Sequence, residues 1–160
     1  MDAICRYPSP LGGMTLASDG NALVGLWFDG QKRFGVAPDG ERAGSGDCAL
    51  EQAARWLDLY FSGRDPGFTP PLAPRGSDFC QRVWRALMRV PYGRTVTYGQ
   101  LAAGLHCRSA QAVGGAVGRN PIALIIPCHR VLGADGGLVG YAAGLDRKAR
   151  LLTLEGAAIR

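Results

Sequence analysis

A cysteine and a histidine end one of the longest apolar runs of the sequence. Residues 122–126 are all apolar, and Pro127, Cys128, His129 and Arg130 follow them. A nearby imidazole or arginine can lower the pKa of a thiol from about 8.5 to about 3.5–7.5 and supply a nucleophilic thiolate. Neighbouring side chains of an extended segment point in opposite directions, so a water is expected to connect Cys128 with His129. The pair is either a reactive nucleophile with its base or a structural thiol beside an unrelated histidine.

A glutamate near the C-terminus is a candidate partner for this histidine. Residues 146–155 predict a helix that Asp146 caps. Glu155 stands in its last turn, where the helix dipole disfavours an acid by roughly several tenths of a kcal/mol. Glu155 is either a solvated surface residue or the partner of His129. In the second case Cys128, His129 and Glu155 would act as nucleophile, base and orienting group.

Two short helices are predicted before the cysteine. Thr97 and Gln100 form a capping box that opens a helix over 98–103, and Ser109 caps a second helix that runs to about Val117. Such a pair is either a plain helical hairpin or a helix-turn-helix. The second helix consists almost entirely of small residues, and each interior glycine costs about 1 kcal/mol relative to alanine. Close helix packing and close approach to a nucleic acid both explain this composition.

The first half of the chain predicts a scaffold for these elements. Apolar segments at 14–17 and 22–28 are joined by a hairpin turn. Residues 29–46 predict a loop, and residues 47–62 predict a helix that Asp47 caps. Nothing in this half indicates a catalytic group.

Charge and proline content divide the 160-residue chain into two parts. A proline-rich segment ends near residue 75, so we expect a β-rich module at 1–74 and a functional domain at 75–160. The first part carries six Lys and Arg against nine Asp and Glu, a net charge of −3, and the second carries twelve against four, a net charge of +8. The basic part either faces a polyanion or has an ordinary solvated basic surface.

Composition excludes several other classes. The five cysteines (Cys5, Cys48, Cys80, Cys107 and Cys128) show no CxxC spacing, so we expect free thiols and no metal site. The apolar runs are too short to span a bilayer, and the start of the chain has no signal-peptide pattern. We therefore expect a cytoplasmic protein that does not bind a membrane.

Several motifs together closely resemble the O6-alkylguanine-DNA alkyltransferase family, and the resemblance covers most of the chain. The most specific motif is Pro-Cys-His-Arg-Val at 127–131, with Asn-Pro at 120–121, Gly-Tyr at 140–141 and Leu-Glu-Gly at 154–156. The spacings Phe79-x4-Trp84 and Tyr92-Gly93-x4-Tyr98 agree as well. The resemblance implies an α+β protein. A small N-terminal α/β module, similar to ribonuclease H, would precede a mainly helical C-terminal domain with a helix-turn-helix.

The resemblance also implies a direct-reversal DNA repair reaction. The protein would bind double-stranded DNA through the minor groove and flip O6-alkylguanine, or O4-alkylthymine, out of the helix. It would then transfer the alkyl group irreversibly to its own Cys128, once per molecule, as a methylated-DNA–protein-cysteine methyltransferase without cofactor or metal. We expect a monomer, with clustering on DNA left open.

Site residues carried over by position fall into three groups. The catalytic group would be Cys128, His129, Glu155, Asn120 and Tyr98. The substrate pocket would be lined by Val131, Tyr141, Ala142, Ala143 and Lys148. DNA contacts would come from Arg108, Ser109, Gln111, Ala112, Gly114, Gly115, Arg119 and Arg130.

Two departures from the family pattern bear on function. Most relatives have an arginine where this chain has Gln111, and glutamine lacks the charge and the planar fork that would fill the space of a flipped base. In the pocket loop, many relatives have serine or glycine at the position of Ala142 and glycine at the position of Ala143. This difference affects the substrate range. Two other functions are considered: a non-catalytic protein that only binds alkyl lesions, against which Cys128 argues, and a cysteine hydrolase.

Overall fold

The computed structural model describes residues 2–31, 41–42 and 46–157. The chain forms two compact units. The first contains Met1–Arg75 and Pro121–Ala123, and the second contains Gly76–Asn120 and Leu124–Arg160. A three-residue segment from the second half of the sequence therefore belongs to the first unit.

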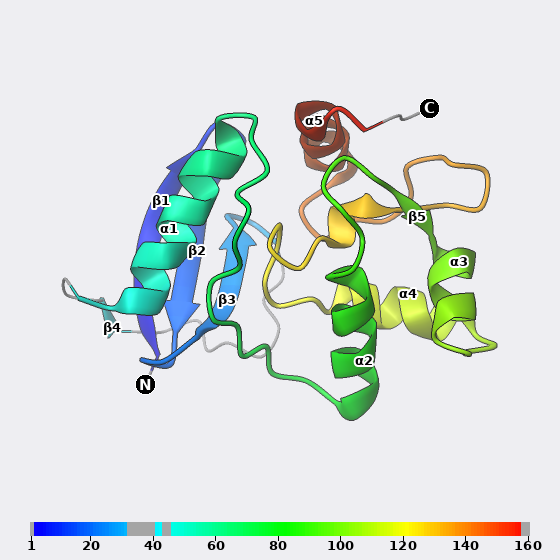
Figure 1. Cartoon of the computed structure of the whole chain (residues 1–160), viewed down its shortest axis with the longest axis horizontal. Coiled ribbons are helices and arrows are strands. Elements are labelled where there is room, and N and C mark those ends of the chain that lie inside the picture. Colours follow the sequence, from blue (N-terminus) through cyan, green and yellow to red (C-terminus); the bar gives the residue numbers. More distant parts are fainter. Residues whose placement is uncertain (1, 32–40, 43–45, 158–160) are drawn as a thin grey trace. The chain divides into compact units, whose positions relative to one another are not determined.

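The first unit is a four-stranded sheet with one helix on a face (Figure 1). The strand order is β3-β2-β1-β4, antiparallel except for the parallel β1–β4 pair. The elements are β1 (Ala3–Ser9), β2 (Gly12–Ser18), β3 (Leu23–Phe28), β4 (Glu41–Arg42) and α1 (Cys48–Phe61). The predicted hairpin and the Asp47 cap, which accepts from Leu50 N over 3.1 Å, are confirmed. The predicted 29–46 loop is wrong at β4, and its residues 32–40 and 43–45 lie outside the described ones.

Backbone from two distant segments covers the outer edge of β3. Leu23 N donates to Pro71 O over 2.8 Å. Farther along the strand, Leu26 N donates to Pro121 O, and Ala123 N donates to Leu26 O, both over 2.9 Å. These bonds satisfy polar groups that an edge strand otherwise exposes. They also fix the chain a few residues before Cys128.

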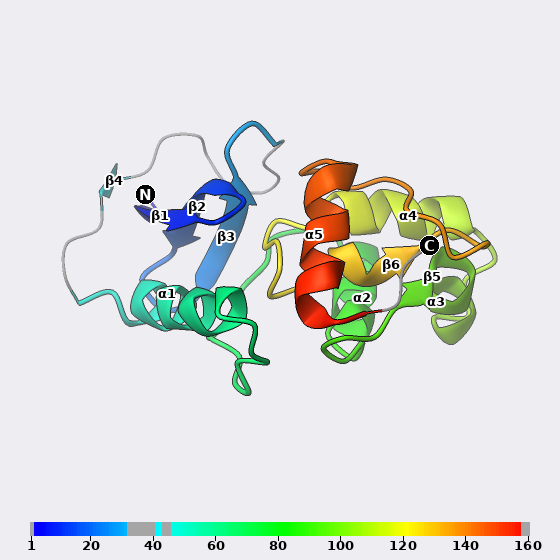
Figure 2. The same ribbon diagram turned by 90° about the horizontal axis from the view of Figure 1, so that it is seen from above.

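The second unit is mainly helical, so the α+β class is confirmed (Figure 2). Its elements are α2 (Asp78–Leu87), β5 (Val96–Thr97), α3 (Tyr98–Gly104), α4 (Ala110–Gly118), the 3₁₀ turn η1 (Cys128–Arg130), β6 (Val131–Leu132) and α5 (Leu145–Glu155). The Thr97 capping box and the Ser109 cap are present as predicted. Trp84 of α2 donates its indole N–H to Ala116 O of α4 over 2.9 Å, which joins the helix pair to α2. Within the described ranges, no helix has both the length and the apolar character needed to cross a membrane.

Two short parallel strands place α3 beside the cysteine turn. In the β5–β6 pair, Val96 is opposite Val131 and Thr97 is opposite Leu132. Tyr98 follows β5 directly, and Cys128 lies three residues before Val131. The pairing therefore brings the first residue of α3 next to the segment that carries the thiol.

Two local sequence predictions are wrong in this unit. Residues 128–130 form a 3₁₀ turn and are not extended. Asp146 lies in the first turn of α5 and does not cap it, because the helix begins one residue earlier, after Gly144. The predicted stop is correct: Gly156 ends α5 in the left-handed conformation, with φ +74°.

Candidate active site

The thiol of Cys128 lies at the start of η1 and is buried. Cys128 is 8% exposed, and its backbone N–H donates to Ile126 O over 2.8 Å. Burial raises the pKa of the thiol, while the Asn120 side chain, the Lys148 charge and nearby backbone N–H groups act in the opposite direction. The resting cysteine is therefore a protonated thiol at neutral pH. It needs a base to become a nucleophile.

His129 and Glu155 form a buried pair beside this thiol. His129 Nε2 lies 2.5 Å from Glu155 Oε2, and both side chains are fully buried. Burial lowers the pKa of His129, Glu155 raises it, and the Arg130 and Lys148 charges lower it further. The imidazole is therefore neutral at pH 7. Because Glu155 occupies Nε2, a proton from Cys128 must be accepted at Nδ1.

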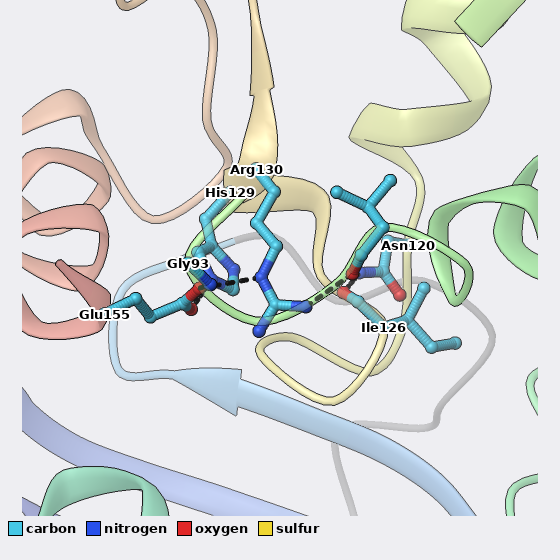
Figure 3. Close-up of polar contacts among 7 residues, drawn as sticks. Gly93, Asn120, Ile126, His129, Arg130 and Glu155 are labelled. Atoms are coloured by element: carbon cyan, nitrogen blue, oxygen red, sulfur yellow. Dashed lines mark hydrogen bonds and ion pairs between the residues drawn. The ribbon is translucent and has the colours of Figure 1, made fainter. Parts of the chain in front are cut away.

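The carboxylate of Glu155 joins three segments of the second unit (Figure 3). One oxygen faces His129, and the other accepts from Arg130 Nε over 2.8 Å and from the Gly93 N–H over 2.9 Å. Glu155 is thus the partner of His129 and not a solvated residue. A buried acid with three partners is tolerated at a helix C-terminus because these contacts outweigh the helix dipole.

The contact of Arg130 with DNA stays a prediction, and the structure places this side chain inside the second unit. Arg130 is only 7% exposed, and besides Glu155 its Nη1 donates to Val90 O over 2.8 Å. Its guanidinium lies over the Tyr92 ring, 5.7 Å from the ring centroid. These contacts turn the side chain into the unit, toward Glu155 and Val90.

Asn120 stands at the end of α4 and is buried. Its amide donates to Ile126 O over 2.7 Å (Figure 3). The bond closes the turn that leads from α4 to Cys128, and the same side chain favours the thiolate form of Cys128. Asn120 thus fixes the path of the backbone and acts on the charge of the thiol.

Tyr98 and Lys148 meet at the loop before α5. Lys148, fully buried, donates to the carbonyl oxygens of Val139 and Gly140 over 2.9 and 3.0 Å. The Tyr98 hydroxyl lies 3.5 Å from the same Val139 oxygen. Burial lowers the pKa of Lys148 to about 8, although the charge that Cys128 carries as a thiolate opposes this shift. Burial, and then the Cys128 charge, raise the pKa of Tyr98, so Tyr98 stays protonated.

The other predicted pocket residues differ in how deeply they are buried. The Tyr141 ring packs edge-on to the His129 ring, with centroids 6.5 Å apart. Val131 is buried in β6, Ala143 is half-buried, and Ala142 is exposed. The Ala143 carbonyl accepts from Arg147 Nη1 over 3.3 Å, which fixes the loop to α5.

The helix pair places most of the predicted DNA-contacting residues on one exposed surface. We call this set the α4 outer face; it consists of Arg108, Ser109, Gln111, Ala112, Gly115 and Arg119, all exposed. Gly114 is different, because a Cβ there would point at the Tyr98 ring, 3.7 Å away. A Cβ at Gly115 would meet nothing closer than an Arg119 nitrogen at 3.9 Å. Packing within the protein therefore does not require a small residue at Gly115.

Several groups of the site have no signal in the sequence. Gly93 and Val90 hold the Glu155–Arg130 pair through backbone atoms, and the Val139 and Gly140 carbonyls hold Lys148. Backbone donors and acceptors are the same at every residue type, so composition cannot reveal them. Only the positive φ of Gly93, +76°, leaves a trace, namely the glycine itself.

The fold and the site define a protein with a helix-turn-helix and a buried Cys–His–Glu arrangement. The chain belongs to the 6-O-methylguanine DNA methyltransferase family. The model of the ribonuclease-like domain of that family matches residues 6–74, and the model of its DNA-binding domain matches residues 78–157. The expected ribonuclease-like module is therefore confirmed.

Relatives of known name and structure agree with this assignment. The methylated-DNA–protein-cysteine methyltransferase of Methanosarcina barkeri is 47% identical, with 92% of each chain covered. That of Mycobacterium leprae is 43% identical, covering 94% of this chain and 91% of the relative. A crystal structure of Mycobacterium tuberculosis OGT in complex with DNA has a TM-score of 0.87 and 41% identity, covering 96% of this chain and 92% of that one.

Proposed function

We propose that this protein repairs alkylated DNA by moving the alkyl group from O6-alkylguanine to its own Cys128. The observation that carries the proposal is the buried Cys128 thiol, held beside a neutral histidine whose far nitrogen is fixed by a buried glutamate. Membership of the methyltransferase family supplies the reaction class. O4-alkylthymine, which carries its alkyl group on an equivalent oxygen, is a second substrate of the same chemistry.

The reaction is a direct displacement at the alkyl carbon. His129 takes the thiol proton of Cys128 at Nδ1, through a bridging water, and Glu155 stabilises the imidazolium. The sulfur–carbon bond forms as the O6–carbon bond breaks, and the electron pair of the broken bond stays on guanine. Tyr98, which remains protonated, donates a hydrogen bond to the base as its charge develops. The released guanine then takes up one proton, which balances the proton lost by the Cys128 thiol.

The product explains why the protein acts once. A thioether on Cys128 has no activated bond that water can readily cleave. The described residues of the site include no second group placed to activate the thioether for cleavage. We infer a stoichiometric, irreversible reaction.

Support for DNA as the partner comes from the α4 outer face. Gly115 stands on it where protein packing does not require a glycine, so the helix backbone can come close to a phosphodiester chain there. Arg108 and Arg119 flank the helix and can neutralise phosphates. We propose that a monomer binds the minor groove and that the damaged base leaves the duplex at a cost of a few kcal/mol, which pocket contacts offset.

Intact-protein mass measured after incubation with duplex DNA containing O6-methylguanine tests the proposal. One added methyl group per molecule is expected, and it should be absent in Cys128→Ala. Cys48→Ala, which removes an exposed cysteine, is the matched control and should still be methylated. Unchanged mass with retained lesion binding would instead identify a non-catalytic lesion-binding protein, and hydrolysis of an ester substrate would identify a cysteine hydrolase.

A further inference from the structure

Arg130 is buried and makes three contacts besides its own chain neighbours. Its Nε donates to Glu155 Oε1 and its Nη1 to Val90 O, each over 2.8 Å, and its guanidinium covers the Tyr92 ring. Figure 3 shows the Arg130 side chain directed at the Glu155 carboxylate. The side chain is 7% exposed, so most of its surface faces the interior of the unit. The contacts direct its positive charge at the carboxylate that orients His129.

The two oxygens of Glu155 have different partners. Oε2 faces His129, and Oε1 accepts from Arg130 and from the backbone of Gly93. Of these three partners, only Arg130 carries a fixed positive charge. Without that charge, the neutral imidazole and the peptide N–H of Gly93 would be left facing a buried carboxylate with less compensation of its charge. A buried anion in that position attracts a proton, and His129 is the group that would hold it.

Other titratable groups around the pair do not replace this charge. Cys128 rests as a thiol, and the Tyr141 hydroxyl stays protonated because burial raises its pKa well above the usual value. Lys148 is cationic below a pH of about 8, but its ammonium group is bound to the Val139 and Gly140 carbonyls. Its charge lowers the pKa of His129 less than the Arg130 charge does.

We propose that Arg130 is a positioning residue that keeps the His129–Glu155 pair free of an extra proton before the reaction, so that His129 can accept the proton of Cys128. This inference rests on the proposed alkyl transfer, in which His129 is the base. A protonated imidazole at rest could not act as one. Arg130 thus acts through Glu155 and does not touch the substrate.

Histidine NMR tests the electrostatic part of the proposal without DNA. The chain has only two histidines, and His106 is exposed and provides an internal reference. In Arg130→Met, His129 should keep its proton to a pH higher by about one unit or more. Arg130→Lys, which keeps the charge, should titrate near the wild type. Arg150→Met, which removes an exposed arginine on α5, is the matched control and should change nothing.

The single-turnover rate of methyl transfer at saturating DNA tests the catalytic part. For Arg130→Met we expect the acid limb of the pH profile to move upward by the same number of pH units as the His129 titration, with the rate recovering as the pH rises. A merely structural role would lower the rate by the same factor at every pH. In Glu155→Gln, where no carboxylate remains to compensate, adding Arg130→Met should move the limb less than it does in the wild type.

Thermal unfolding monitors whether the variants fold. If Arg130→Met does not fold, Arg130→Gln takes its place. Glutamine carries no charge but can still donate a hydrogen bond to Glu155. An unchanged His129 titration and an unmoved acid limb would overturn the role of Arg130 while leaving alkyl transfer intact. A moved His129 titration in a protein that never becomes methylated would overturn the proposed function and keep the electrostatic role.

Discussion

Gly93 and Glu155 fit against each other at two points. The Gly93 N–H donates to the Glu155 carboxylate over 2.9 Å, and a Cβ on Gly93 would stand 3.1 Å from the Glu155 carbonyl oxygen. Gly93 also has φ +76°, a left-handed conformation that other residues rarely adopt. The turn after α2 is therefore part of the structure that orients His129.

Gly93→Ala should slow methyl transfer, because the added methyl group displaces Glu155. Gly67 provides a matched control, since it has the same φ of +76° but nothing within 4 Å of its Cβ position. Both variants should lose about 1–2 kcal/mol of unfolding free energy from the left-handed conformation alone. Only Gly93→Ala should also lower the single-turnover rate. Equal rates in the two variants would contradict the positioning role of this turn.

Gly115→Ala should stabilise the fold and weaken DNA binding. Alanine is favoured over glycine within a helix by about 1 kcal/mol, and the site has space for the methyl group. The methyl group projects from the α4 outer face, where it would hold a DNA backbone away. Gly114→Ala is the control, because its methyl group meets the Tyr98 ring at an ordinary contact distance of 3.7 Å. Chemical denaturation and DNA titration measure the two effects, and equal affinities in both variants would argue against this DNA-binding surface.

Gln111→Arg should increase DNA affinity and the rate of base flipping. Arginine adds a charge and a planar fork at an exposed position of the α4 outer face. Gln52→Arg, on α1 of the first unit, adds the same charge elsewhere and separates position from net charge. Fluorescence of a reporter base opposite the lesion follows flipping. Unchanged affinity together with an unchanged reaction rate would disprove this role of position 111.

Lys148 should give the reaction an alkaline limb near pH 8. Its pKa is lowered to about 8 by burial, so its charge is present below that pH and is lost above it. That charge favours the Cys128 thiolate, and its loss should slow transfer as the pH rises. Lys148→Arg keeps the charge and should abolish the limb, whereas Lys148→Met should be slow already at pH 7. Single-turnover rates at saturating DNA between pH 6 and 9 check this, and an unaltered limb in both variants would contradict it.

Local rules predicted much of the fold around the site. The Thr97 capping box, the Ser109 cap and the Gly156 stop depend on a few adjacent residues, and the structure confirms all three. The unfavourable position of Glu155 at a helix C-terminus left two interpretations open, and the structure confirms the one in which His129 is its partner. An energetically unfavourable residue in a helix is informative because something must compensate for it.

Arg130 shows where such rules fail. A count of basic residues treats every arginine as solvent-exposed, whereas this one is buried against Glu155 and the Val90 carbonyl. Strand β4 was missed for a related reason, since its two residues owe their conformation to pairing with β1. Contacts between residues distant in sequence decide both cases.

The pairing of Leu26 with Pro121 and Ala123 has a consequence for synthesis on the ribosome. The sheet of the first unit is made early, but the residues that cover this part of its edge emerge almost a hundred positions later. At ordinary elongation rates the strand waits on the order of ten seconds with unpaired amides. During that interval a nascent chain can pair with a neighbouring one, so the yield of folded protein should depend on translation speed.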